Sequence, residues 1–303
     1  MSFRHCEEAL KVSTKQPPLK QGMRISIVNP SETKAILKKF NIRLTKKLGQ
    51  HFLVDANIIA KEITAAGLTE ADTVLEIGPG IGALTEALAG KAGRVIAIEV
   101  DKRFMSIVEE TLAGQPNVTI IRADALDLKL GSFGANKLIS NLPYNVATPL
   151  IVKVLTEAPE ITEATVMVQK EVARRMTAPP GDDDYGPLAI TIDAYAAARI
   201  LFSVSPRSFL PPPEVESAVV AIKRRLQPLY GDDTTAFLLF VRELFTFRRK
   251  TVRSALKTRQ SALVSQIAET VIAEAGLTSE SRVEKLTPAE LFNVFAAQKR
   301  FLS

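Results

Sequence analysis

Cysteine and histidine are scarce in this sequence. Cys6 is the only cysteine among 303 residues, so no disulfide can form within the chain, and this scarcity favours a reducing compartment. His5 and His51 are the only histidines, and with so few thiolate and imidazole ligands we expect no structural zinc site and no other bound metal. These features predict a cytoplasmic protein without a metal centre.

Long hydrophobic runs are also missing. No apolar stretch approaches the roughly 20 residues of a membrane helix, so we expect no membrane partner. Residues 1–22 contain Glu7, Glu8 and several lysines, and they lack the hydrophobic centre of a signal peptide. We expect this segment to be a disordered extension. There is no internal repeat and no low-complexity tract.

The rest of the composition is that of a soluble globular protein. Hydrophobic residues make up 46% of the chain and charged residues 24%. The length is sufficient for a full α/β domain and a smaller second domain. Lys and Arg number 39 against 33 Asp and Glu, a net charge of +6. This moderately basic balance is compatible with a nucleic-acid partner.

A glycine-rich turn follows the first clear strand. Residues 74–77 predict a short buried strand, Gly78, Gly80 and Gly82 predict a sharp turn, and residues 81–88 resume helical spacing. Such a turn brings backbone close to a nucleotide at the carboxyl end of a parallel sheet. The spacing G-x-G-x-G is one residue shorter than the dinucleotide motif, so it favours S-adenosylmethionine, which carries adenosine without phosphate. A tight turn without a ligand is the alternative.

Acidic residues end the next two predicted strands. Glu99 lies in strand 94–100, about 20 residues beyond the glycines, where a carboxylate accepts hydrogen bonds from ribose hydroxyls. Asp124 closes strand 118–123 and, with the neighbouring Ala125 amide, is placed to bind the adenine of the cofactor. The alternatives are a strand-end carboxylate that faces water at Glu99 and a turn-forming aspartate at Asp124.

The segment Asn141-Leu142-Pro143-Tyr144 follows the predicted strand 137–140. The exocyclic amine of adenine is a poor nucleophile because the ring delocalises its lone pair. Hydrogen-bond acceptors at both N–H bonds favour the pyramidal geometry that attacks a methyl sulfonium. The Asn141 side-chain oxygen and the Leu142 carbonyl can supply these acceptors, Pro143 fixes the second carbonyl, and Tyr144 offers a face on which the base stacks.

Catalysis at this segment would consist of alignment and stabilisation of developing charge, without a strong general base. The alternative is a proline-terminated strand with a buried tyrosine. Phe209 lies in a proline-rich loop, and we expect it to cover the other face of an extruded base. The alternative at Phe209 is an anchor for the loop in the core.

Basic residues gather in the C-terminal part of the chain. The predicted RNA-contacting residues are Arg248, Arg249, Lys250, Arg253 and Lys257. Arg249, Arg253 and Lys257 recur every four residues and predict a stripe along one helix face. In a basic protein with a base-modifying site we interpret this stripe as a phosphate-contacting surface, and an ordinary solvated helix face is the alternative.

The order of the elements predicts an α/β protein with a second, helical domain. Alternating strands and helices up to residue 227 predict a mostly parallel, doubly wound, seven-stranded sheet with an antiparallel edge. From residue 228 to 303 the pattern is helical. We expect Ser31 to cap a helix over 31–40, Asp55 to cap a helix that runs to Ala66, and Thr287 to open the last helix. The predicted division is 1–22, 23–227 and 228–303.

Several separate blocks together resemble the ribosomal RNA adenine N6,N6-dimethyltransferases, and most closely their bacterial small-subunit branch. The similarity runs from about residue 25 to the C-terminus. The blocks are Lys46-Lys47-Leu48-Gly49-Gln50-His51-Phe52-Leu53, Glu76-Ile77-Gly78-Pro79-Gly80, Asn141-Leu142-Pro143-Tyr144, Phe209-Leu210-Pro211-Pro212-Pro213-Glu214-Val215-Glu216-Ser217-Ala218-Val219 and Phe247-Arg248-Arg249-Lys250-Thr251.

The resemblance implies a Rossmann-like class I methyltransferase domain followed by a small helical RNA-binding domain. It implies a monomer that uses S-adenosylmethionine to dimethylate two adjacent adenosines near the 3′ end of small-subunit ribosomal RNA, within an immature 30S particle. The cofactor residues that it implies are Gln50, His51, Leu53, Gly78, Gly80, Glu99, Asp124, Ala125 and Asn141. Many members of the family have asparagine where this chain has His51.

Other functions remain open at this stage. Within the same chemistry, the Erm branch methylates an adenine of large-subunit RNA, but the Phe-Leu-Pro-Pro-Pro and Phe-Arg-Arg-Lys-Thr blocks favour the small-subunit branch. DNA adenine methyltransferases more often carry Asp/Asn-Pro-Pro-Tyr. A non-catalytic nucleic-acid-binding relative would not need an intact Asn141, Pro143 and Tyr144. A nicotinamide dehydrogenase is the most distant alternative.

Overall fold

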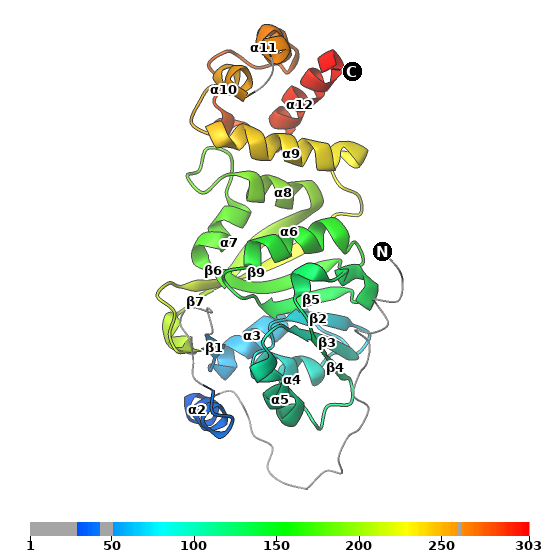
Figure 1. Cartoon of the computed structure of the whole chain (residues 1–303), viewed down its shortest axis with the longest axis vertical. Coiled ribbons are helices and arrows are strands. Elements are labelled where there is room, and N and C mark those ends of the chain that lie inside the picture. The colour runs from blue at the N-terminus through cyan, green and yellow to red at the C-terminus, as the bar shows by residue number, and fades with distance from the viewer. Residues whose placement is uncertain (1–28, 43–50, 260–261, 303) are drawn as a thin grey trace.

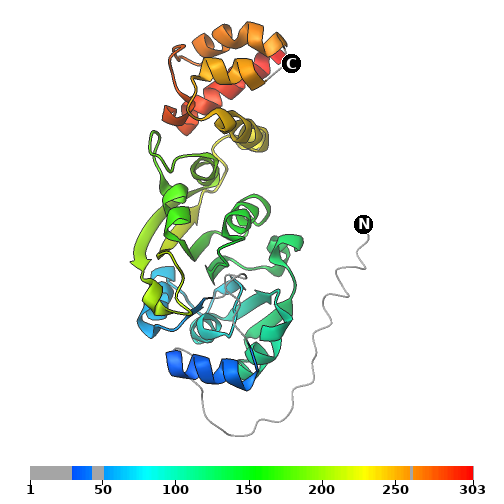
Figure 2. The ribbon, with the colours of Figure 1, turned by 60° about the vertical axis from the view of Figure 1, so that its left-hand side comes forward.

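The computed structural model describes residues 29–42, 51–259 and 262–302. The predicted extension 1–22 and the predicted cofactor residue Gln50 lie outside these ranges. The molecule is elongated, with the C-terminal helices at one end and α2 (Pro30–Lys39) at the other, as Figures 1 and 2 show from two sides. Within the described ranges no helix is both long and apolar enough to cross a membrane.

A seven-stranded sheet forms the centre of the larger part. Its strands are β2 (Thr73–Ile77), β3 (Arg94–Glu99), β4 (Val118–Arg122), β5 (Lys137–Asn141), β6 (Glu163–Gln169), β7 (Ala196–Val204) and β9 (Ser217–Arg224). They lie in the order β4-β3-β2-β5-β6-β9-β7. Strands β2 to β6 pair in parallel, whereas β9 runs antiparallel to both β6 and β7. The mostly parallel sheet and its antiparallel edge are both confirmed: the edge strand β7 pairs antiparallel with β9, which is the reversed strand one position inside the edge.

Helices cover both faces of this sheet. One face carries α3 (Ala56–Ala66), α4 (Ala83–Ala89) and α5 (Lys102–Thr111); the other carries α6 (Ala147–Glu157), α7 (Lys170–Thr177) and α8 (Pro187–Tyr195). Neighbouring strand residues point to opposite faces, so Val74 joins the first core and Leu75 the second. The inner strands β3 and β6 are buried along nearly their whole length, as expected for a sheet covered on both faces, whereas the edge strands β4 and β7 are partly exposed.

The helix starts follow their capping residues. Asp55 caps α3, and its carboxylate accepts a hydrogen bond from the Asn57 N–H at 3.0 Å, as predicted. The predicted cap Ser31 is wrong: Asn29 caps α2 and accepts from the Glu32 N–H at 2.9 Å. Pro30 occupies the first turn, where its missing N–H costs nothing, and this proline moves the helix start one residue ahead of Ser31.

In the described residues after the sheet the α-helices are α9 (Thr234–Leu244), α10 (Val252–Arg259), α11 (Ala262–Glu274) and α12 (Pro288–Leu302). The predicted capping box opens α12, because the Thr287 N–H donates to Glu290 Oε2 at 2.8 Å and the Glu290 N–H donates to Thr287 Oγ1 at 3.2 Å. Short 3-10 helices lie at Ala125–Asp127, Leu130–Phe133, Pro206–Ser208, Gly231–Asp233, Phe245–Phe247 and Val283–Lys285.

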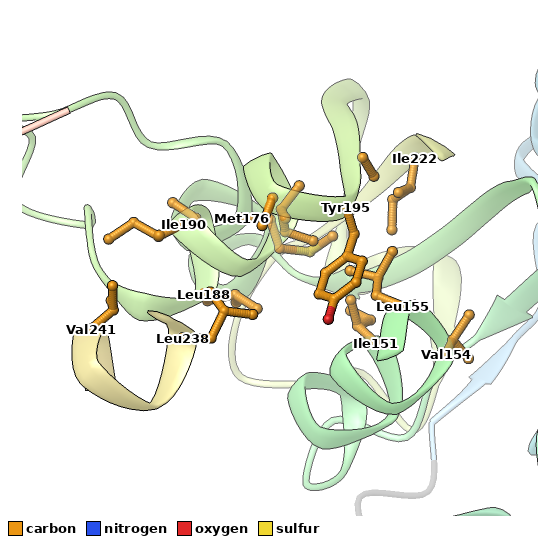
Figure 3. Close-up of a cluster of buried hydrophobic side chains, with 14 of the residues drawn as sticks. Ile151, Val154, Leu155, Met176, Leu188, Ile190, Tyr195, Ile222, Leu238 and Val241 are labelled. Atoms are coloured by element: carbon orange, nitrogen blue, oxygen red, sulfur yellow. The ribbon is translucent and has the colours of Figure 1, made fainter. Parts of the chain in front are cut away.

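The helical part shares a core with the sheet. Figure 3 shows Leu188 and Ile190 of α8 beside Leu238 and Val241 of α9, with side chains of α6 in the same cluster. The cluster is continuous from the sheet to α12. Burial of each such side chain stabilises the fold by about 1.5–3 kcal/mol. The helices from α9 onward are therefore anchored to the α/β part by apolar packing.

Two short strands join distant segments of the chain. β1 (Phe52–Leu53) pairs antiparallel with β8 (Phe209–Leu210), so that Leu53 faces Phe209. The pairing continues where the Val54 N–H donates to the Ser208 carbonyl at 2.8 Å. This small ladder was not predicted, and it brings the segment after Gln50 against the proline-rich loop.

Candidate active site

A cavity of about 300 Å³ lies at the carboxyl ends of the central strands. β2 pairs with β3 on one side and with β5 on the other, so the chain leaves the sheet in opposite directions around this point. Open α/β sheets bind ligands at such a switch point. The wall combines the glycine turn, the end of β3, the segment 141–146, the 51–53 segment and Phe209. Four of the predicted motif blocks therefore meet at one place.

The glycine turn passes very close to the other walls of the cavity. Gly78 and Gly80 have φ angles of +77° and +60°, in the left-handed region that favours glycine. A Cβ at Gly78 would lie 3.1 Å from Pro143 Cγ, and one at Gly80 would lie 3.0 Å from the Phe52 ring. Neither position has room for a side chain without displacement of its neighbour. The turn thus presents bare backbone to the cavity.

Carboxyl groups give the cavity an acidic wall. Glu76, Glu99, Asp101 and Asp124 all line it. Glu99 accepts hydrogen bonds from the Gly80 N–H at 3.1 Å and from the Asp101 N–H at 2.8 Å, which fixes its position beside the glycine turn. Burial raises the pKa of Glu99, although these two hydrogen bonds act in the opposite direction.

A pair of glutamates lies deeper in the site. Glu76 of β2 is 2% exposed, and burial raises its pKa to about 8; the Thr85 side chain acts in the opposite direction and the charge of Glu99 in the same direction. The Glu76 Oε2 atom has no hydrogen-bond partner within the described part of the chain. Glu62 of α3 is fully buried, and burial followed by the charge of Glu76 raises its pKa to about 8. Burial thus favours the protonated form of both groups well above the ordinary range of a carboxyl group.

Asn141 ends β5 between the cavity and Glu62. The hydrogen-bond network assigns its amide orientation: with the nitrogen turned to Glu62, it donates to Oε1 at 3.0 Å and to Oε2 at 3.2 Å. The amide oxygen then lies at the opposite end of the group, and Asn141 forms part of the cavity wall. An acceptor oxygen at this position is what the sequence-based mechanism requires.

Tyr144 is held in place from two sides. Its hydroxyl lies 2.6 Å from Ser217 Oγ on β9, and burial raises its pKa. Its ring stacks with that of His51 at a centroid distance of 5.7 Å and an angle of 28°. His51 Nδ1 in turn lies 2.8 Å from the Pro211 carbonyl, the partner to which a protonated Nδ1 donates. His51 thereby connects Tyr144 to the proline-rich loop.

Phe209 belongs both to the core and to the cavity wall. It is 5% exposed, packs in the core beneath α3 to α5, and lines the cavity. This position combines the two alternatives that the sequence left open. A stacking role for its ring stays a prediction.

The predicted cofactor residues gather as expected, with two exceptions. His51, Leu53, Gly78, Gly80, Glu99, Asp124 and Asn141 line the cavity. Ala125 is buried behind Asp124, and Gln50 lies outside the described residues. Asp124 also caps the following 3-10 helix, because it accepts from the Leu126 N–H at 2.9 Å. It is therefore a turn former and a wall residue at the same time.

Sequence reasoning missed Glu62 and did not assign Glu76 a role. A signal for Glu62 exists, because Ile59, Glu62 and Ala66 are the buried residues of α3 and follow helical spacing. A glutamate in a helix ordinarily lies on the solvated face, so the residue type alone offered no reason to expect Glu62 in the core. Phe104, whose ring packs edge-on against Phe52 and lines the cavity, was also missed.

The predicted basic stripe is wrong in its geometry. α10 begins at Val252, so Arg249 lies in the turn before the helix, and only Arg253 and Lys257 share its exposed face. Both of these residues pair with Glu269 of α11, and Lys257 Nζ lies 3.5 Å from Glu269 Oε1. This carboxylate offsets part of the positive charge on the helix face.

The turn before α10 carries the less compensated charge. Arg248 pairs with Glu284 at 3.2 Å and donates to the Asp183 carbonyl at 3.0 Å. Arg249 and Lys250 are exposed, and neither has a carboxylate within ion-pair distance in the described ranges. These two side chains are the most accessible cations of the predicted cluster.

The cavity fits S-adenosylmethionine by size and by charge. A volume of about 300 Å³ lies at the small end of the range for cofactor pockets. The sulfonium and the ammonium of this cofactor are cations, and Asp101 and Asp124 place carboxylates on the wall, while the unpartnered Oε2 of Glu76 offers a hydrogen-bond acceptor. The bare backbone at Gly78 and Gly80 permits the close approach of an adenosine without phosphate.

Comparison with known proteins gives concordant results. The family described as ribosomal RNA adenine dimethylase matches residues 41–299. Two curated relatives are both named ribosomal RNA small subunit methyltransferase A. The one from Alkaliphilus oremlandii is 40% identical over 272 residues, which cover 87% of this chain and 95% of the relative. The one from Shouchella clausii is 41% identical over 275 residues, which cover 87% and 93%.

Two solved structures resemble the fold over most of its length. A dimethyladenosine transferase from Plasmodium falciparum has a TM-score of 0.71 and 26% identity, covering 83% of this chain and 98% of its own. The 23S rRNA methyltransferase ErmE has a TM-score of 0.62 and 28% identity, covering 82% and 99%.

Proposed function

The chain belongs to the ribosomal RNA adenine dimethylase family, and from this premise we propose that it dimethylates the N6 amines of two adjacent adenosines near the 3′ end of small-subunit ribosomal RNA. S-adenosylmethionine is the proposed methyl donor. One observation carries the proposal: Asn141, Leu142, Pro143 and Tyr144 form part of the same cavity wall as the glycine turn and Glu99. The acceptors for an amine and the place for a donor are thus adjacent.

The chain's own residues prepare the amine for attack. In the proposed reaction the Asn141 side-chain oxygen and the Leu142 carbonyl accept hydrogen bonds from the two N6–H groups, and these contacts favour a pyramidal nitrogen. The cofactor, when bound, supplies an electrophilic methyl group on a positively charged sulfur. The nitrogen becomes acidic as the new bond forms, so its proton leaves to water without a strong base. The contribution of the protein is alignment and charge stabilisation.

Aromatic side chains hold the base in this proposal. Tyr144 is fixed through Ser217, so its ring has a defined plane on which an extruded adenine can stack. Phe209 lines the same cavity, on the short ladder with Leu53. Stacking on two rings would compensate for the loss of base stacking in the RNA.

The acidic wall receives the cofactor in the same proposal. Glu99 would accept from the ribose hydroxyls, and Asp124 with the Ala125 amide would bind the adenine. The chemistry of the donor set supports these roles, because Glu99 is already oriented by two backbone N–H groups. Gly78 and Gly80 of the glycine turn line the same cavity and add no side chain to it.

The helical part, residues 228–303, is the proposed RNA-binding domain. Arg249 and Lys250 are exposed and lack carboxylate partners within the described ranges, so they are available to phosphates. The proposed partner is an immature 30S particle, bound by a monomer in the cytoplasm. The overall charge of +6 supports a polyanionic partner.

Small-subunit RNA is proposed over large-subunit RNA because the curated relatives carry small-subunit names at 40–41% identity. The test is transfer of tritiated methyl groups to undermethylated small subunits, with large subunits and DNA as competitors. We expect N6,N6-dimethyladenosine in small-subunit RNA alone. Label in the large subunit instead would favour an Erm-type activity. No label on any substrate, at a retained cofactor affinity, would indicate a non-catalytic relative.

A further inference from the structure

A fully buried carboxyl group lies directly behind the proposed amine-binding residue. Glu62 projects from α3 toward the sheet and has no exposed surface. Ile59 and Ala66 occupy the neighbouring buried positions of the same helix, so an apolar side chain would suit Glu62's position on packing grounds alone. A buried carboxyl group destabilises a fold unless partners compensate for its lost hydration. Its presence here calls for a contribution other than packing.

The contact that Glu62 makes decides which end of an amide enters the cavity. An asparagine amide has a donor end and an acceptor end of nearly equal shape. The Asn141 nitrogen donates to both Glu62 oxygens, at 3.0 and 3.2 Å. The opposite orientation would replace these two contacts by at most one, from the O–H of a protonated Glu62, and would turn the N–H donors toward the incoming amine. The target amine donates hydrogen bonds through its N–H groups, so the end of the Asn141 amide that faces it must be the acceptor oxygen.

We propose that Glu62 is a positioning residue, which holds the Asn141 amide with its oxygen toward the target amine. This inference rests on the proposed function and deepens it, because it assigns a residue that acts through Asn141 and touches no substrate. A carboxyl group accepts through its carbonyl oxygen in either protonation state, so the contact survives protonation. The titratable neighbour that acts on Glu62 is Glu76 of β2, and Glu99 of β3 acts on Glu76 in turn.

The matched test compares Glu62→Met and Glu62→Gln. Methionine has a similar length and no strong acceptor, so the amide loses its orienting partner. Glutamine retains an acceptor oxygen. We expect Glu62→Met to lower kcat about tenfold, the factor that corresponds to one lost hydrogen bond of ordinary strength. KM for the RNA and Kd for the cofactor should change less than about twofold, because neither ligand touches Glu62. Glu62→Gln should restore most of kcat.

Two further measurements separate this role from a structural one. In an Asn141→Ala background, Glu62→Met should cause no additional loss in single-turnover rate, because Glu62 acts only through that amide. Thermal unfolding of Glu62→Met at pH 8 should occur at an equal or higher temperature than in the wild type. The control is Glu109→Met, the same change at an exposed position of α5, which should leave kcat unaltered.

A wild-type kcat in Glu62→Met would overturn the inference. It would also be overturned if Glu62→Met lowered the single-turnover rate as much in the Asn141→Ala background as in the wild type. Either result leaves the proposed function intact, provided that the wild type methylates small-subunit RNA. Absence of methylation by the wild type would instead remove the proposed function itself. The two failures are therefore distinguishable within one set of assays.

Discussion

Raising the pH from about 5 to about 8 should weaken the fold, and Glu62→Gln should remove part of this weakening. The unfolded chain releases the Glu62 proton near the ordinary pKa of 4.5, whereas burial keeps that proton on the folded chain up to about 8. Between these values the folded state binds more protons than the unfolded state. The stabilisation is complete below 4.5 and is lost as the pH rises to about 8.

The size of the effect follows from the pKa shift. One pKa unit corresponds to about 1.4 kcal/mol. A shift from 4.5 to about 8 therefore means that the titration of Glu62 lowers the free energy of unfolding by about 4–5 kcal/mol between these pH values. Glu76 acts in the same direction, because burial raises its pKa as well. Glutamine does not titrate, so Glu62→Gln should reduce the slope of stability against pH by up to about 1.4 kcal/mol per pH unit.

The assay is urea unfolding of the cofactor-free protein, followed by far-UV circular dichroism at several pH values between 5.5 and 8. Glu109→Gln, an equivalent change at an exposed position, serves as the control and should reproduce the wild-type slope. Parallel stability curves for wild type and Glu62→Gln would refute the reasoning. They would mean that Glu62 is ionised in the folded state or is reached by water.

Three further outcomes are expected. Gly80→Ala should weaken cofactor binding about tenfold or more, as measured by titration calorimetry. A φ of +60° costs a non-glycine residue about 1–2 kcal/mol, and the new Cβ would lie 3.0 Å from a ring of the cavity wall. An unchanged affinity would contradict the fit of the cofactor to this cavity. Phe209→Ala should lower kcat more than cofactor affinity, and unchanged turnover would remove its stacking role. Arg249→Glu with Lys250→Glu should reduce RNA affinity and the slope of log affinity against log salt, by about one per lost phosphate contact. Arg253→Glu, which alters a residue already paired with a carboxylate, should have the smaller effect, and equal effects would contradict the ranking.

Much of the fold could be read from local patterns. The caps at Asp55 and Thr287 were predictable because a capping residue and its partner lie within three residues of each other. The place of β9 inside the sheet was not, because strand order depends on long-range packing that no local pattern encodes. Arg249 follows a helical period in sequence, yet it precedes α10, because helix ends are set by tertiary contacts as well as by periodicity.

The candidate site was predictable where the residue type itself carries the chemistry. Asn141, Glu99 and the glycines follow strand ends, and parallel strands place those ends at one edge. The helical spacing of Ile59, Glu62 and Ala66 could have placed Glu62 on the buried face of α3, but its contact with Asn141 depends on tertiary packing that the spacing does not encode. The ladder between Leu53 and Phe209 was equally hidden, since two-residue strands leave no periodic signal.

The apolar cluster between α8 and α9 has a consequence for target choice. It makes the C-terminal helices a rigid arm of fixed length, so the span from Arg249 and Lys250 to Asn141 is built into the packing. If Arg249 and Lys250 hold RNA as proposed, only bases that lie at this distance from the contact can reach Asn141. The enzyme would then select its adenine by distance. Substitutions that loosen the apolar cluster should reduce the selectivity for one adenine, although they change neither Asn141 nor the pair Arg249 and Lys250.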